Sequence, residues 1–281
     1  MVDPDIEAPS VLIIGGSLTG PFNYWPLRRR LIERGAARVD IAPIWPMDWL
    51  AAGFVGLGPL LTRTGLAVRR TWRAGGRRPI IVIGHSAGGL LARLATSEVA
   101  FQGRRTAVAP SIGAIVTLGT PHRLGATTTA WPAHPGHRAA AFLERHVPGT
   151  AFAPQTGYLT VGSSFVAPTP DRGPAIPPLG QRAAGRVLRE ARTALLGAWD
   201  RPSPGDGIVP EPAVHLRGAR QLSFDDVLHG HIGGPWYADD AIVDRWWPVA
   251  LEVWRDAIRA RAGAPPDTEG VGPFARNDPS G

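Results

Sequence analysis

The chain of 281 residues contains no cysteine and no lysine. The lack of cysteine excludes disulfide bridges, a thiolate nucleophile and thiolate-bound metal sites. No apolar run approaches the roughly 20 residues that a membrane-spanning helix needs. The acidic start of the chain also lacks the basic and apolar regions of a secretory signal. We therefore expect a protein without an integral membrane segment, located in the cytoplasm.

The absence of lysine bears on the meaning of the net charge. All 30 basic residues are arginine, and with 23 acidic residues they give a formal charge of +7. Such an excess can indicate a nucleic-acid or anionic-membrane partner. The arginines are scattered, however, and the clusters at 28–30, 69–70 and 77–78 fall where helices or loops are expected. We interpret them as solvated helix faces and expect no nucleic-acid partner.

The order of apolar segments predicts the fold class. Hydrophobic residues make up 44% of the chain, which is enough for a large core. Near-continuous apolar strands alternate with helix-like segments, as in a parallel sheet covered by helices on both faces. The expected strands are 11–14, 38–42, 80–83, 112–118, 158–161 and 220–224. The sequence thus predicts an α/β fold with a mostly parallel, doubly wound sheet.

The domain organisation follows from the same pattern. We expect an N-terminal extension (1–9), one α/β domain (10–262) and a disordered C-terminal tail (263–281). Two long connections, about 122–155 and 167–204, are interpreted as lid-like insertions. The last helix is expected near 241–262, and Pro248 is predicted to break or kink it.

The most informative motif is GHSAGG at residues 84–89. It stands between the predicted strand 80–83 and a helix-like segment. In this context G-x-S-x-G forms a nucleophile elbow, a strained turn that exposes the serine hydroxyl at the top of a sheet. The motif predicts Ser86 as a nucleophile.

A serine nucleophile needs a base, and the base needs an acid that orients it. In hydrolases with this elbow the acid follows the serine in the chain and the histidine comes last. Asp206 is the candidate acid, because flanking glycines and the following Ile-Val suit a loop that reaches inward. Asp225 and Asp226 are rivals. Either His229 or His231 could be the base, and the local sequence leaves both open.

An oxyanion formed at the serine needs two backbone donors. One is the N–H of Ala87, which follows the nucleophile. The loop GGSLTG at 15–20 supplies the other, with Ser17 preferred and Gly16 as the alternative.

Other residues are candidates for the substrate site. We expect His85, His122 and Trp236 to contact the substrate. The apolar stretch 45–61 could line an acyl pocket, form an apolar lid, or simply pack as an ordinary helix and loop. The histidine spacing predicts no metal site, and no cofactor is required.

Together these motifs resemble the α/β-hydrolase superfamily, and more narrowly its lipases and esterases. The strings GHSAGG, GTPH (119–122) and GDGIVP (205–210) and the late histidine occur in the family's order over roughly residues 10–260. GTPH is similar to the strand end of triacylglycerol lipases and inositol-deacylase-like lipases. PWY at 235–237 is similar to bacterial and plant members of that group. The early Gly-Gly departs from the His-Gly or Pro-Gly of many members.

The resemblance implies an α/β-hydrolase fold and assigns Ser86, Asp206 and His229 as the catalytic triad. It also implies Ser17 and Ala87 as oxyanion donors. The expected reaction is hydrolysis of a small or lipid-like carboxylic ester through an acyl-enzyme. Thioester hydrolysis or acyl transfer on the same residues is the alternative, and a non-catalytic ligand receptor is a further one. The sequence makes no prediction of oligomeric state.

Overall fold

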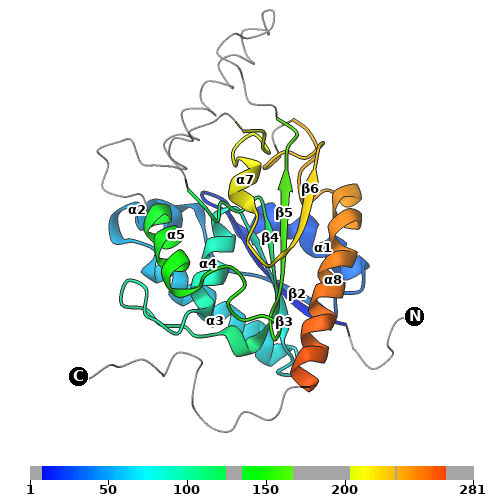
Figure 1. Cartoon of the computed structure of the whole chain (residues 1–281). Coiled ribbons are helices and arrows are strands. Elements are labelled where there is room, and N and C mark those ends of the chain that lie inside the picture. The colour runs from blue at the N-terminus through cyan, green and yellow to red at the C-terminus, as the bar shows by residue number, and fades with distance from the viewer. Residues whose placement is uncertain (1–7, 125–134, 167–202, 232, 264–281) are drawn as a thin grey trace, which may run out of the picture.

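The computed structural model describes residues 8–124, 135–166, 203–231 and 233–263 (Figure 1). Its centre is a six-stranded sheet in the order β2-β1-β3-β4-β5-β6, and every strand is parallel to its neighbours. The strands are β1 (Ser10–Ile14), β2 (Arg38–Ile41), β3 (Ile80–His85), β4 (Ile112–Leu118), β5 (Gly157–Ser163) and β6 (Arg220–Phe224). All six predicted strands are confirmed.

Helices cover both faces of this sheet (Figure 1). One face is packed by α2 (Pro46–Val55), α3 (Gly58–Ala74), α4 (Ala87–Thr96) and α5 (Pro135–His146). The other is packed by α1 (Trp25–Glu33) and α8 (Asp240–Ala262). Three short helices complete the described part: η1 (Pro21–Tyr24), η2 (Ala109–Ser111) and α7 (Glu211–Val214).

The burial of the strands explains why their sequences are almost entirely apolar. Leu12 and Ile14 of β1 belong to the core under α3 and α4, whereas Val11 and Ile13 belong to the core under α1 and α8. Successive side chains of a strand point to opposite faces, and here both faces are covered. A continuous apolar run is therefore needed in place of an alternating one.

The last helix differs from expectation. Of the predicted break or kink at Pro248, the break is wrong, because α8 is continuous over Asp240–Ala262 (Figure 1). Proline removes one helical hydrogen bond, but Trp246, Trp247 and Trp254 on both sides of it are buried against the sheet. Pro248 itself is exposed. Tertiary packing of the apolar face thus outweighs the local preference.

The strand order also shows where a ligand is expected. The chain forms β1, moves outward to β2 at the edge of the sheet, and returns to β3 on the other side of β1. In open α/β sheets ligands bind beyond the carboxyl ends of the strands at such a switch point. The loop GGSLTG follows β1 and Ser86 follows β3, so both lie at this place.

Several expectations lie outside the described residues. They are most of the second insertion, with its helix-like stretch 181–198, and the C-terminal tail. Within the described residues, no helix is long and apolar enough to span a bilayer.

Candidate active site

Ser86 occupies a sharp turn between β3 and α4. Its backbone has φ 52° and ψ −128°, a conformation that costs a non-glycine residue about 1–3 kcal/mol. The neighbouring glycines make the turn possible. A Cβ on Gly84 would lie 2.4 Å from the Cα of Gly89, and a Cβ on Gly88 would lie 2.2 Å from the carbonyl oxygen of Ile14. The G-x-S-x-G spacing is therefore required by close backbone contacts.

The structure brings Ser86, His229 and Asp206 into one hydrogen-bonded row, and we call these three residues the triad. His229 Nε2 lies 2.9 Å from Ser86 Oγ, and His229 Nδ1 lies 2.8 Å from Asp206 Oδ2. The backbone N–H of His229 also donates to the carbonyl oxygen of Asp206 over 2.8 Å. Asp206 and His229 are buried, and Ser86 is half-buried.

The surroundings of Asp206 favour its charged form. Burial alone raises the pKa of the carboxyl, but His229 and the backbone N–H groups of Val209 and Ile208 outweigh burial, so the pKa is lowered. Those two amides donate to Oδ1 over 2.7 and 3.1 Å. The Tyr237 hydroxyl donates to Oδ2 over 2.9 Å. An ionised carboxylate that accepts all these bonds is a fixed acceptor for the histidine.

The charge of Asp206 determines the tautomer of His229. A carboxylate only accepts, so Nδ1 of the imidazole carries the hydrogen and Nε2 is free to accept. The Ser86 hydroxyl then donates to Nε2. This arrangement can remove a proton from the serine as the serine attacks an electrophile.

The structure explains why the GTPH string begins with glycine. Gly119 directly follows β4 and has φ +54°, in the region that favours glycine. A Cβ there would lie 2.7 Å from Asp206 Oδ2 and 3.0 Å from His229 Nδ1. Asp206 and His229 therefore pack directly against the backbone of Gly119, where a side chain would not fit. The next residue, Thr120, donates its hydroxyl to the carbonyl oxygen of Ser86 over 2.9 Å.

The two expected oxyanion donors both border the nucleophile. Ala87 is the first residue of α4, so its N–H has no acceptor within the helix. The Gly16 N–H is already bonded to the Tyr24 hydroxyl over 2.9 Å. Within the described residues, the Ser17 N–H has no acceptor. The contacts therefore favour Ser17 over Gly16 as the second donor.

The remaining predicted site residues lie at different depths. The rings of His85 and Trp236 are buried behind His229 and pack edge to face, with centroids 5.7 Å apart. His231, the rival base, is exposed, and its ring stacks on that of Trp236 with the centroids 5.6 Å apart. Asp226, a rival acid, pairs with Arg245 over 2.7 Å at the surface.

His122 points away from the triad. Its Nε2 lies 3.0 Å from Thr117 Oγ1, and its Nδ1 lies 3.3 Å from a guanidinium nitrogen of the buried Arg93. Burial lowers the pKa of His122 well below 6.5, and Arg93 acts in the same direction. Both nitrogens of the neutral ring are thus occupied within the protein.

Tyr24 and Tyr237 contact the site, although sequence reasoning did not single out either hydroxyl. Tyr237 follows Trp236 in the string PWY, and Tyr24 ends the short helix η1 after the oxyanion loop. Those positions were visible in the sequence. The acceptors of the two hydroxyls depend on loops distant in the chain, so no local pattern could have revealed them.

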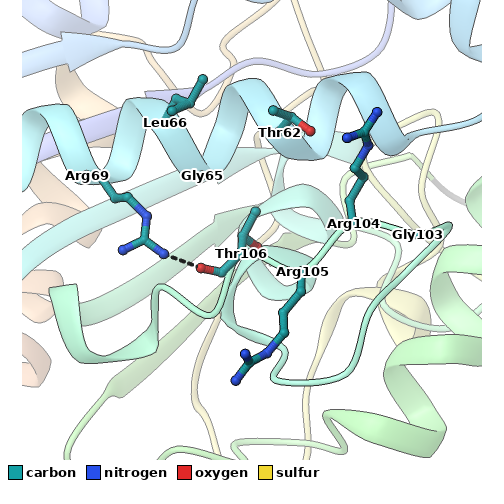
Figure 2. Close-up of a pocket in the computed structure, with 8 residues that line it drawn as sticks. All are labelled: Thr62, Gly65, Leu66, Arg69, Gly103, Arg104, Arg105 and Thr106. Carbon is teal, nitrogen blue, oxygen red and sulfur yellow. Dashed lines mark hydrogen bonds between the residues drawn. The ribbon is translucent and has the colours of Figure 1, made fainter.

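A hollow of the surface lies apart from the triad and is lined by none of its residues. It lies between α3 and residues 103–106 and carries Arg69, Arg104 and Arg105 (Figure 2). Arg69 donates to the carbonyl oxygen of Thr106, and Arg105 pairs with Glu98. The guanidinium groups of Arg104 and Arg105 point in different directions (Figure 2). They do not converge on one position, so the hollow lacks the geometry of an anion site. No cluster of metal-ligating side chains occurs among the described residues.

A comparison with protein families gives a match over part of the chain. The model of the family described as "PGAP1-like alpha/beta domain" matches residues 70–133. This part of the chain spans β3, Ser86, α4 and β4. The six parallel strands carry the serine elbow after β3, and the histidine and acid lie on later loops. The fold is that of the α/β hydrolases.

Solved structures resemble the whole chain more distantly. A thermophilic esterase from Thermogutta terrifontis is 12% identical, with a TM-score of 0.48, and the match covers 95% of this chain and 87% of that one. A putative α/β-superfamily hydrolase from Xanthomonas campestris pv. campestris is 14% identical, with a TM-score of 0.37, over 90% and 98% of the two chains. One structure from work on the metagenome-derived lipolytic enzymes LipS and LipT is 12% identical, with a TM-score of 0.46, over 88% and 96%. No curated protein matches the chain in sequence.

Proposed function

We propose that this α/β hydrolase cleaves carboxylic esters through a covalent acyl-serine. One observation carries the proposal: a strained serine at the switch point of the sheet shares a row of hydrogen bonds with a histidine and an ionised aspartate. A packing role would not need a half-buried serine in a costly backbone conformation.

The first half of the reaction forms the acyl-enzyme. Ser86 Oγ attacks the ester carbonyl carbon while its proton passes to His229 Nε2. Asp206 stabilises the imidazolium that results. The amides of Ala87 and Ser17 donate to the carbonyl oxygen as it becomes negative, a contribution of about 3 kcal/mol per donor in serine hydrolases. His229 then gives its proton to the departing alcohol.

The second half regenerates the enzyme. Water gives a proton to His229 and attacks the acyl carbon. The tetrahedral intermediate collapses, and Ser86 leaves with the proton that His229 returns. The product is a free carboxylic acid. Every proton in this cycle moves through Nε2, so the reaction requires a neutral His229 at the start.

Apolar side chains near the oxyanion loop favour an uncharged substrate. Leu18, Phe22 and Trp45 are each about half-exposed. The rings of Phe22 and Trp45 lie side by side, with their centroids 6.5 Å apart. On α2, Met47 and Phe54 are 70% and 92% exposed. Only part of stretch 45–61 thus packs as an ordinary helix. Esters with short or medium apolar acyl chains fit such a surface better than charged substrates do.

A fluorophosphonate probe tests the proposal, because it reacts only with an activated serine. We expect one covalent adduct, and peptide mass spectrometry should place it on Ser86. Ser86→Ala should abolish the adduct and lower kcat on p-nitrophenyl butyrate by about 10⁴-fold or more. A folded wild-type protein without the adduct would contradict the proposal.

Alternative reactions on the same residues are separated by substrate choice. An oxygen ester and an acyl-CoA of equal chain length should be compared, with and without an added alcohol or amine acceptor. Hydrolysis of the oxygen ester should dominate. Preferred transfer to the acceptor would indicate an acyltransferase, and a preference for acyl-CoA would indicate a thioesterase.

A further inference from the structure

A second chain of hydrogen bonds runs beside the triad and joins three separate segments. The Gly16 N–H donates to the Tyr24 hydroxyl oxygen over 2.9 Å. That hydroxyl lies 2.8 Å from Nδ1 of His85, and Nε2 of His85 lies 2.8 Å from the carbonyl oxygen of His229. All four residues are buried. The oxyanion loop is thus connected to the backbone of the histidine that contacts Ser86.

The last acceptor sets the direction of every bond in this chain. A carbonyl oxygen only accepts, so Nε2 of His85 carries the hydrogen. Nδ1 of the neutral ring must then accept, and the Tyr24 hydroxyl donates to it. The Tyr24 oxygen consequently keeps a lone pair for the Gly16 N–H. The chain admits one arrangement of hydrogens, and every buried polar group in it is satisfied.

Burial keeps the connecting ring uncharged. It lowers the pKa of His85 from 6.5 to about 3, and the nearby His229 acts in the same direction. The two imidazole centroids are 4.9 Å apart. A charged His85 would oppose the positive charge that His229 acquires when it takes the serine proton. The neutral ring can therefore hold the backbone of His229 without disfavouring the reaction.

We propose that Tyr24 and His85 are positioning residues that hold the oxyanion loop and His229 at a set spacing around Ser86. The proposal rests on the function proposed above. The spacing is tight, because a Cβ on Gly16 would lie 2.8 Å from the Cβ of Ser86. A small shift of this loop moves the Ser17 N–H relative to the atom that Ser86 attacks.

The expected effect is on the chemical step. Without the Tyr24 hydroxyl, the aromatic packing against Trp236 remains, but the directional link between the two loops is lost. Substrate still binds, while donor and base are no longer aligned in the transition state. The lost alignment matters only in the transition state, so kcat should fall while KM stays nearly unchanged.

The experiment compares Tyr24→Phe, His85→Leu and His85→Gln in the full chain, with p-nitrophenyl butyrate as substrate. Tyr24→Phe and His85→Leu should each lower kcat by about 10-fold, the size of loss seen when groups that orient catalytic ligands are removed. The amide nitrogen of His85→Gln can still donate to the His229 carbonyl, so this variant should recover part of the loss. The double variant Tyr24→Phe/His85→Leu should be no worse than His85→Leu alone, because both act through one chain.

Tyr158→Phe is the matched control. Tyr158 is also buried, but it lies in the core on the opposite face of the sheet and takes no part in the hydrogen bonds of the triad or of the second chain. Its kcat and KM should stay at the wild-type values.

Three outcomes would overturn the positioning roles. The first is a Tyr24→Phe variant with the wild-type kcat. The second is a kcat loss that follows the melting temperature, and the third is a His85→Gln variant no better than His85→Leu. If Tyr24→Phe does not fold, the comparison of His85→Gln with His85→Leu still tests the positioning role. A wild-type protein that takes no fluorophosphonate adduct on Ser86 would instead refute the proposed function itself.

Discussion

The carboxylate of Asp206 is held on every side by donors, and Tyr237 is the only side-chain donor besides His229 among the described residues. Burial raises the pKa of Tyr237 well above 10, and the neighbouring carboxylate raises it further, so the hydroxyl keeps its hydrogen. It therefore donates throughout the neutral pH range and fixes the oxygen that the histidine uses.

Tyr237→Phe removes this donor and leaves the ring in place. A hydrogen bond to a charged group contributes about 1.5–3 kcal/mol, so we expect a lower free energy of unfolding and a lower kcat. Urea denaturation and ester hydrolysis would measure the two effects. Tyr158→Phe again serves as the control, and equal behaviour of the two variants would contradict the role given to Tyr237.

Gly119 and Gly35 form a matched pair for testing the space around the triad. Both have positive φ, +54° and +89°, but a Cβ on Gly35 would meet nothing within 4 Å. Each Gly→Ala substitution should lower the free energy of unfolding by about 1–2 kcal/mol through backbone strain. Gly119→Ala should in addition displace Asp206 or His229.

Activity distinguishes the two variants. Gly35→Ala should keep the wild-type kcat, whereas Gly119→Ala should lose about 100-fold, as expected for a small misplacement of reacting groups. An active Gly119→Ala protein would show that the contact between residue 119 and the triad can relax without cost.

The site residues differ in how far the sequence reveals them. Ser86 was predictable because the elbow requires a local pattern of glycines, a strand and a helix. Asp206 could be predicted because of its order in the chain. The choice of His229 over His231 came from a resemblance, since both share one loop. Tyr24 and Tyr237 act through acceptors more than 30 residues away, and local spacing carries no information about such contacts.

At the scale of elements, α8 shows packing overriding propensity. The helix turns Trp246 and Trp254 into the core, and its exposed side carries Pro248 and Asp244. Proline has no N–H, so the backbone carbonyl of Asp244, four residues earlier, lacks its usual helical hydrogen bond. Water can satisfy that carbonyl at the surface. A proline on the buried side would leave the carbonyl unpaired.

Pro248→Ala should therefore stabilise the protein. It restores one N–H donor and removes the ring, and proline costs up to about 3 kcal/mol in a helix interior relative to alanine. The gain will be smaller than this limit, because α8 has adapted to the ring. A higher urea midpoint with unchanged activity is the expected result, and a destabilised variant would contradict this interpretation of the helix.

At the scale of the whole molecule, two buried histidines make stability depend on pH. The pKa of His85 is lowered to about 3 and that of His122 well below 6.5, in both cases chiefly by burial. Below pH 6.5 the unfolded chain binds protons that the folded protein does not. Their full contribution to stability is thus present above pH 6.5 and is lost as the pH falls.

The free energy of unfolding should fall between pH 6.5 and 5, and each histidine adds up to about 1.4 kcal/mol per pH unit to the slope. Asp206, with its lowered pKa, loses its stabilising effect only below its ordinary value of 3.8, outside this range. Urea denaturation at several pH values should show a flatter slope for His122→Gln than for wild type. Equal slopes would show that His122 is protonated in the folded protein.

The sequence by itself determined the layered architecture and the nucleophile. A buried parallel strand must be apolar on both faces, and a strained turn needs glycine at fixed offsets, so both leave a local record. Only the tertiary structure decided which histidine meets Ser86, which amide remains free in the oxyanion loop, and why Gly119 lies under the triad. These facts depend on loops that meet at the carboxyl edge of the sheet. Their contacts arise from the path of the whole chain, and no single segment encodes them.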